Sequence, residues 1–304
     1  MRLFIVAPVL ALCCAGCAIK PLPENVTGND TYQIVQKIRC ETRDSIRSFI
    51  LGVLDSNDPN AAAGLRNGSL TFEVVNRDRK RLSPEARAAL DKYDQAAIAY
   101  DFTFDITEKN DVSANLDFLR TFSRGPLTLG VSGSSERQRQ NTRNFRVTDS
   151  FEELVTKVSD DYCVDGRVPP NYVYLITGSI GMIELVGTFL DLNQSGNLSG
   201  TKDSPDVPQV ADTIAFTTTF GGSANPKIVL SPLSKGFDLA DASLTASASR
   251  SDVHKVIIAL SLPPEKKKTS KASQGSAKAA ANSMVEYQIY RNLTNRGFIV
   301  LPGT

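Results

Sequence analysis

The sequence predicts an α+β protein built from two similar units, each with helical sequence followed by a three- or four-stranded antiparallel meander. Two observations lead to this fold class. Alternation of apolar and polar residues, typical of a half-buried strand, begins at residues 100–106 and again at 212–217. Sequence with helical character precedes each of these stretches, at 31–54 and at 180–192. Helical and strand sequence therefore follow one another in the same order twice.

Residues 100–151 and 212–262 share more than their first strand. The offset between matching features drifts only from 110 to 113 residues, as small loop insertions would produce. We interpret the match as an internal duplication, with chance recurrence of short polar words as the alternative. The matching features are Ser-Ala-Asn at 113–115 and 223–225, a Ser-basic-Gly turn at 123–125 and 234–236, and a serine-rich strand ending at Arg137 and at Arg250.

The predicted helices carry recognisable start signals and apolar stripes. The stretch from Thr31 to Leu54 has its apolar residues at helical spacing, with Lys37, Arg39, Glu41, Arg43, Asp44 and Arg47 on its polar face. Ser83-Pro84 pairs a capping serine with a proline at the first helical position. Ser150 followed three residues later by Glu153 matches a capping box. Residues 180–192 are apolar enough to predict a buried helix.

The first residues have the pattern of an export signal. Arg2 supplies a positive charge, and the apolar run from Leu3 to Cys14 is shorter than the roughly 20 residues that a permanent membrane span needs. The run ends in Cys14-Ala15-Gly16-Cys17, which resembles the lipobox of bacterial lipoproteins, with Cys14 standing where Leu or Val is usual. An ordinary signal peptide with incidental cysteines is the alternative.

The lipoprotein resemblance implies removal of residues 1–16 and acylation of Cys17, the membrane anchor. Two or more acyl chains hold a protein firmly on a bilayer, at about 0.8 kcal/mol per buried CH₂. Ala18, rather than an acidic residue, follows the cysteine. By resemblance to lipoprotein sorting, this favours the outer membrane. Residues 17–30 are polar and contain two prolines, and we expect them to be a tether.

Cysteine usage is simple once the signal has been removed. Cys40 and Cys163 are then the cysteines besides Cys17. Because two free thiols rarely persist in an oxidising envelope, we predict a disulfide between them, with two separate buried thiols as the alternative. Closing so long a loop stabilises a fold by on the order of 4 kcal/mol in the chain-entropy model.

The rest of the chain divides into a first unit at 31–162, a second at 163–262, a basic flexible linker at 263–283 and a C-terminal segment at 284–304. The linker prediction rests on the run Lys266-Lys267-Lys268 and the Ser/Ala/Lys composition that follows. The C-terminal segment regains apolar content, so we expect it to pack on the body. No stretch beyond the signal reaches membrane-spanning length.

Charge and motifs exclude several classes of function. One of the 34 basic residues, Arg2, leaves with the signal, so the rest balance the 33 acidic residues and nucleic-acid binding is not indicated. No phosphate-binding glycine motif occurs, and we expect no small-molecule cofactor. Asp191 to Gly196 begins like a calcium loop, but Lys202 replaces the bidentate glutamate, and we predict no metal site. His254 is the one histidine, and we expect it on a strand surface.

These observations favour a non-enzymatic, outer-membrane-anchored lipoprotein that binds or scaffolds another envelope protein. Its exposed sheet edges would suit contacts by strand addition. One alternative is an envelope hydrolase acting on cell-wall or extracellular polymer, with His254 and Asp252 in its active site. Another is a surface-exposed lipoprotein that contacts host or neighbouring cells.

Overall fold

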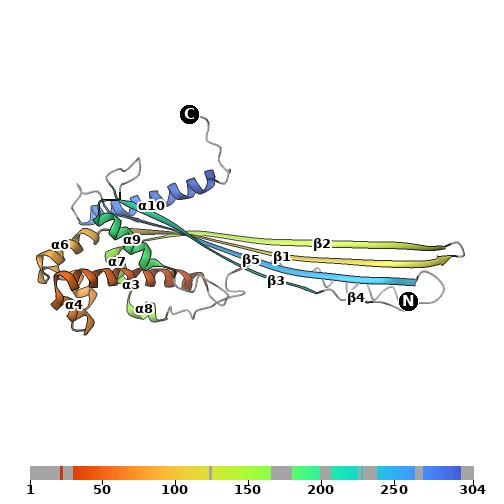
Figure 1. Ribbon diagram of the computed structural model, residues 1–304, viewed down its shortest axis with the longest axis horizontal. Coiled ribbons are helices and arrows are strands. Elements are labelled where there is room, and N and C mark those ends of the chain that lie inside the picture. Colours follow the sequence, from red (N-terminus) through yellow and green to blue (C-terminus); the bar gives the residue numbers. More distant parts are fainter. Residues whose placement is uncertain are drawn as a thin grey trace, which may run out of the picture. The chain divides into compact units, whose positions relative to one another are not determined.

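The computed structural model describes residues 21–22, 30–122, 125–165, 180–198, 207–224, 227–228, 238–263 and 270–295. Runs of helices and pairs of long strands follow one another along the chain, and the strands form one antiparallel sheet, which confirms the α+β class (Figure 1). In order, the elements are α3 (Thr31–Asn57), α4 (Pro59–Arg66), α5 (Phe72–Arg77), the 3₁₀ helix η1 (Arg79–Arg81), α6 (Pro84–Tyr93), β1 (Ala97–Phe122), β2 (Gly125–Ser150), α7 (Phe151–Lys157), α8 (Asp160–Asp165), α9 (Met182–Gln194), β3 (Gln209–Ala224), β4 (Lys227–Ile228), β5 (Asp238–Ser261) and α10 (Ser270–Asn295).

The strands form one sheet in the order β2-β1-β5-β3, with the short β4 paired antiparallel to β5. The inner strands are therefore β1 and β5, one from each of the two similar stretches of sequence. The sequence does not specify whether the two stretches share a sheet, and the structure places their strands in one sheet. Residues 100–151 and 212–262 each supply long strands to a shared sheet, and the residues of β1 and β5 around Ile98 and Ile258 are buried because both faces of the sheet are covered there.

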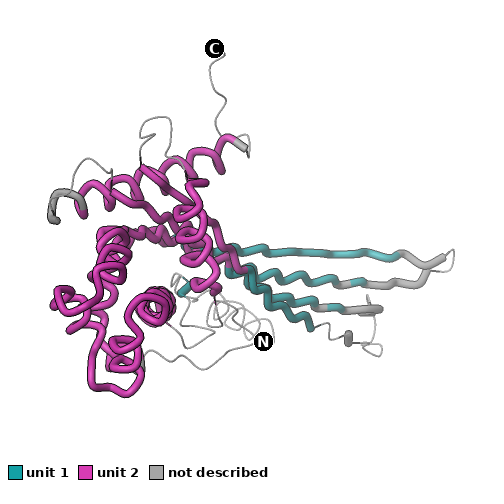
Figure 2. Tube along the Cα trace, turned by 60° about the vertical axis from the view of Figure 1, so that its left-hand side comes forward, with its two compact units in different colours: residues 1–25, 105–142, 217–252 teal, residues 26–104, 143–216, 253–304 magenta. Residues whose placement is uncertain are grey.

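The chain divides into two compact units that differ from the predicted ones (Figure 2). Unit 1 contains residues 1–25, 105–142 and 217–252, and unit 2 contains residues 26–104, 143–216 and 253–304. Each long strand thus contributes residues to both units. The units predicted at 31–162 and 163–262 do not coincide with these units, since β1 from the first and β5 from the second are neighbours in one sheet.

The core of unit 2 lies on both faces of the inner strands. Tyr100, Phe102 and Phe104 of β1 share one face and pack in a cluster with residues of α3, α7 and α9. Ala97 and Ala99 face the other way and pack with Ala277 and Ala281 of α10. Large side chains on one face and alanines on the other therefore allow α10 to approach the sheet closely.

Helix α10 corrects the predicted linker at 263–283 from residue 270 onwards, and residues 264–269 lie outside the described residues. Residues 270–295 form a continuous helix, and Ala277, Ala281 and Val285 are fully buried along one side of it. These three residues are four apart, the spacing of a helical stripe. Alanine and lysine are also good helix formers, so the composition that suggested a flexible linker is equally suited to a helix.

Helix α3 begins where its sequence predicts. The Asp30 side chain accepts a hydrogen bond from the backbone of Gln33, and the Gln33 side chain accepts one from the backbone of Asp30. This capping box satisfies two backbone donors at the start of the helix. Ile34, Ile38 and Ile46 then bury one face of α3 in the core of unit 2. Helix α7 starts with the predicted capping box between Ser150 and Glu153.

Candidate interaction site

The predicted site residues fall in different parts of the structure. Cys17 lies outside the described residues. Cys40 of α3 and Cys163 of α8 are joined by a disulfide that spans 123 residues of sequence, with their Cα atoms 5.6 Å apart. Both cysteines belong to unit 2. The bridge therefore holds α8 against α3 within unit 2.

His254 corrects the prediction of a surface histidine. Its side chain is 1% exposed, and its ring centroid lies 4.7 Å from that of Phe104. Burial lowers the pKa of His254 to about 4. Asp252, the proposed catalytic partner, is also buried and accepts two hydrogen bonds from Arg250, at 2.7 and 2.9 Å. Neither residue is placed where a polymer substrate could reach it.

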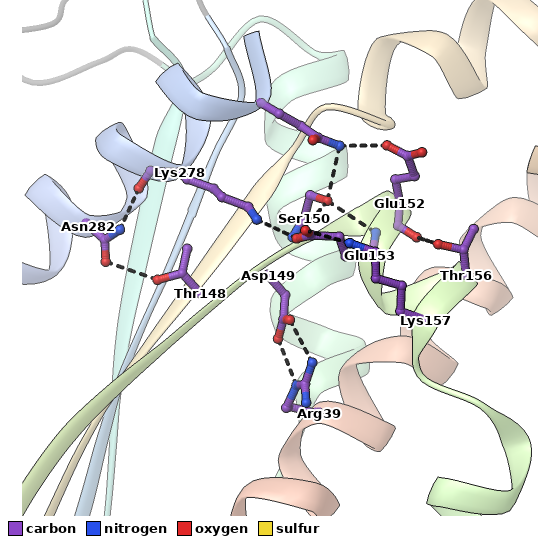
Figure 3. Close-up of polar contacts among 11 residues, drawn as sticks. Arg39, Thr148, Asp149, Ser150, Glu152, Glu153, Thr156, Lys157, Lys278 and Asn282 are labelled. Atoms are coloured by element: carbon purple, nitrogen blue, oxygen red, sulfur yellow. Dashed lines mark hydrogen bonds and ion pairs between the residues drawn. The ribbon is translucent and has the colours of Figure 1, made fainter. Parts of the chain in front are cut away.

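A polar network surrounds the start of α7 in unit 2 (Figure 3). Asp149, the penultimate residue of β2, accepts two hydrogen bonds from Arg39 of α3, at 2.7 and 2.9 Å. Glu153 caps Ser150 and accepts hydrogen bonds from Lys157 and from Lys278 of α10. Partial burial of Glu153 opposes its ionisation, but the bonds from Lys278, the Ser150 backbone and Lys157 outweigh it and lower its pKa to about 2. The network joins α3, α7 and α10.

A second carboxylate satisfies the start of α9. Both oxygens of Glu41 accept the Ile180 amide, and one of them also accepts the amides of Gly181 and Met182, at 2.8–3.1 Å. A carboxylate at this position also interacts favourably with the positive end of the helix dipole. Glu41 was expected on the polar face of its helix. This role could not be predicted from local sequence, because the partner lies 139 residues further along the chain.

The sheet of unit 1 has two chemically different faces. Glu108 of β1 pairs with Arg139 of β2 and with Arg250 of β5, so these three side chains share a face. Asp105 contacts Gln140, and a Cβ on Gly130 would lie 3.1 Å from Asp117, which places these residues on the opposite face. Because side chains alternate along a strand, these contacts assign every described position of β1, β2 and β5 to a face.

The face of Asp105, here called the polar face, carries only Ser, Thr, Gly, Gln, Asn or charged side chains among the described residues of unit 1. A Cβ on Gly221 would lie 3.9 Å from the Cβ of Ser249, which assigns β3 in the same way. The polar face consists of the odd positions 105–117 of β1, the even positions 128–142 of β2, the odd positions 217–223 of β3 and the odd positions 243–251 of β5.

The face of Glu108, here called the apolar face, is different. It carries Val112 of β1, Leu129 and Val131 of β2, Phe220 of β3, and Ala246 and Ala248 of β5. Val112, Leu129 and Val131 are among the exposed large hydrophobic residues of the described chain. Scattered exposed hydrophobic residues are ordinary, but among the described residues of unit 1 they are restricted to one face of the sheet, which points to a contact surface.

Arg250 fastens the N-terminal chain to the apolar face. Its guanidinium ion-pairs with Asp252 and Glu108, and it donates a hydrogen bond to the backbone carbonyl of Leu22 at 2.8 Å. Asn141 of β2 donates to the carbonyl of Pro21, also at 2.8 Å. Asn141 and Arg250 both belong to the apolar face by the alternation of their strands. Residues 21 and 22, expected within a loose tether, are therefore bound.

The remaining candidates for chemistry are weak. A pocket in unit 2 is lined by residues that include Tyr93, Asp94, Arg79 and Phe151. Burial raises the pKa of Asp94, although Arg79 ion-pairs with it. Among the described residues, no three His, Cys, Asp or Glu side chains are grouped to hold a metal. None of the described helices has the length and apolar content needed to cross a membrane.

These features define an α+β protein that presents an open antiparallel sheet with one polar and one apolar face. The family model described as "Uncharacterised protein y4kA" matches residues 20–288. A protein of Sinorhizobium fredii (strain NBRC 101917 / NGR234) with the same description is 38% identical over 275 residues, covering 87% of this chain and 84% of the relative. The chain therefore belongs to the Y4kA family.

Solved structures show only a faint likeness. The InvG secretin of the Salmonella SPI-1 injectisome in its open-gate state matches with a TM-score of 0.22 and 8% identity, over 62% of this chain and 65% of that one. A chain of the Klebsiella pneumoniae type II secretion outer-membrane complex of PulD, PulS and PulC matches with a TM-score of 0.24 and 8% identity, over 74% of this chain and 47% of that one. This chain thus spans less than two thirds of either, and likeness at this level carries no argument.

Proposed function

We propose that this protein is an exported, lipid-anchored scaffold of the bacterial cell envelope that binds a partner protein through the outer strands of its sheet. It performs no reaction in this proposal. The anchor is Cys17, and Ala18 after it favours the outer membrane. The observation that carries the proposal is the sheet order β2-β1-β5-β3, which leaves β2 and β3 at the two ends.

An outer strand offers backbone donors and acceptors on its free side. A partner strand can pair with them, and the backbone bonds then supply affinity while alternate side chains supply specificity. Strand β2 is 26 residues long and β3 is 16, so either gives a long template. The exposed polar side chains of unit 1 keep such an edge hydrated until a partner arrives.

The burial of His254 and Asp252 supports the non-enzymatic part of the proposal. A general base must reach the proton that it abstracts, within hydrogen-bond distance or through one water. The His254 ring lies against Phe104 in the core of unit 2, and Asp252 is held by Arg250. Both side chains are therefore packed inside the protein, away from solvent, rather than placed in an open active site.

Site-specific photo-cross-linking in intact cells tests the proposal. A photoreactive amino acid at Gln138 of β2 or at Thr217 of β3 should yield a reproducible adduct with an envelope protein. The matched control is Lys109 of the inner strand β1, which lies beside Gln138 on the polar face because Glu108 pairs with Arg139. Adducts should be absent or weak from Lys109. Equal adducts from Lys109, or none from either outer strand, would overturn the proposal.

A further inference from the structure

We infer that the apolar face of unit 1 contacts the acyl chains of the bilayer in which Cys17 is anchored. The inference deepens the proposed function and rests on its lipid anchor. It names a second membrane contact, made by the folded protein rather than by its lipid. Three observations carry it: the difference between the two faces, the exposure of the hydrophobic residues, and the route of the N-terminal chain.

The two faces differ in a way that matches a water–lipid boundary. On the apolar face, Val112 is 46% exposed, Leu129 53% and Val131 51%. Alanines 246 and 248 lie on the same face of β5, so small apolar side chains extend the surface across the inner strands. The polar face presents hydroxyl, amide and charged groups at every described position except its glycines. One face therefore gains from leaving water and the other does not.

The N-terminal chain brings the anchor to the end of the apolar face that carries Asn141 and Arg250, about 33 Å of strand from Val131. The carbonyls of Pro21 and Leu22 are bound by Asn141 and Arg250, both on this face. Cys17 is four residues before Pro21, and four residues of extended chain span at most about 14 Å. The lipid therefore enters its bilayer within that distance of Pro21. A loose tether attached anywhere else on the protein would not impose this limit.

Four charged side chains of the apolar face neutralise one another where the chain is fastened, and the exposed Arg137 of β2 lies on the same face beyond them. Glu108 pairs with Arg139 and Arg250, and Arg250 also pairs with Asp252. The four side chains form a connected set of opposite charges, which lowers the cost of bringing this end of the face towards lipid. Any part of the sheet that enters hydrocarbon also needs its outer strands paired, because unpaired backbone groups are costly there. The contact is therefore confined to the side chains of the apolar face, and the backbone of the outer strands stays in the hydrated headgroup region.

Fluorescence from paired positions tests the inference. With Cys17 acylated and Cys40 bound to Cys163, a single added cysteine is the free thiol of the mature chain. Val131→Cys and Ser132→Cys, on opposite faces of β2, would each carry the environment-sensitive probe NBD. The full mature protein is placed on vesicles of phosphatidylethanolamine and phosphatidylglycerol. Leu129→Cys and Thr128→Cys form a second pair, in case one variant does not fold.

The expected result is a several-fold rise and blue shift of NBD emission at Val131→Cys on vesicles, with quenching by doxyl-labelled lipid. Ser132→Cys should stay quenched by iodide from the water. Emission that does not change at residues 129 and 131, or that changes equally at 128 and 132, overturns the inference. A Cys17→Ser chain can be held on nickel-chelating vesicles by an N-terminal histidine tag. The same NBD measurement then tests whether the apolar face contacts lipid without the acyl anchor. A missing anchor and a face that does not contact lipid therefore give different results.

Discussion

Units 1 and 2 share the same four long strands but use them differently. In unit 2 the inner strands are buried on both faces, by large side chains on one side and by α10 on the other. In unit 1 the continuing strands carry Ser, Thr and charge on one face and exposed Val112, Leu129 and Val131 on the other. Buried apolar surface is the main source of folding stability, so unit 2 contributes most of the stability of the protein. Unit 1 contributes surface, which suits a role in contacts.

The largest expected effect on stability comes from a substitution in the core of unit 2. Phe189 of α9 is fully buried, so Phe189→Ala should lower the free energy of unfolding by about 3–5 kcal/mol through lost packing and a cavity. Val131→Ala removes an exposed side chain in unit 1 and should change the free energy of unfolding by less than about 0.5 kcal/mol. Urea unfolding measures both variants. Equal losses would mean that unit 1 is as important for stability as unit 2.

The next largest effect should come from the disulfide in unit 2. The Cys40→Ser, Cys163→Ser double variant loses a link that closes a loop of 123 residues. We expect a loss of on the order of 4 kcal/mol in unfolding free energy, because the unfolded chain regains its entropy. Wild-type protein in reductant is the matched control and should show the same loss. Stability that is insensitive to reductant, or two thiols that alkylate before reduction, would contradict the link.

His254 should make unit 2 sensitive to mild acid. Its folded pKa is about 4, below the ordinary value of 6.5, so the unfolded chain binds a proton more readily between these values. The contribution of His254 to stability is complete above pH 6.5 and is lost as the pH falls to 4, by up to about 3 kcal/mol. Urea midpoints from pH 7 to 4 measure it. His254→Gln should flatten this window, and an unchanged slope in that variant would contradict the assignment.

The smallest effect should come from the attachment of α10. Lys278→Met removes a partner of Glu153, whose folded pKa of about 2 lies below the ordinary 4.5. Stability from Glu153 is complete above pH 4.5 and is lost as the pH falls to 2. We expect a loss of about 0.5–1 kcal/mol at pH 7, because solvent screens this partly exposed group. Lys157→Met, at a more exposed lysine, should cost less. Equal costs would show that Lys278 has no special role in holding α10.

The sequence predicted the elements of unit 2 better than their assembly. The capping signals at Ser83 and Ser150 mark helix starts in the structure, because such caps are local in sequence. The pairing of β1 with β5 was missed, because short matching words suggest similar pieces but do not say which strands become neighbours. Helix α10 was missed although Ala277, Ala281 and Val285 gave a helical stripe, because their small size resembles linker composition.

The contact surfaces were less visible in the sequence. Alternation along β1 and β5 was apparent, but the burial of His254 depends on which face of β5 meets Phe104. The binding of Pro21 and Leu22 depends on Asn141 and Arg250, more than 100 residues away. Such long-range partners follow from strand order and register, which one sequence does not specify.

The account depends most on Cys17, and metabolic labelling with an alkyne analogue of palmitate tests it most directly. Cells producing the wild-type chain or Cys17→Ser would be fed the analogue, and the protein captured and conjugated to a fluorophore. The account predicts strong labelling of the wild type and none of Cys17→Ser, with the wild type in the outer-membrane fraction. Equal labelling of both chains, or an unlabelled wild-type protein that fractionates with soluble proteins, would contradict a lipid-anchored envelope protein.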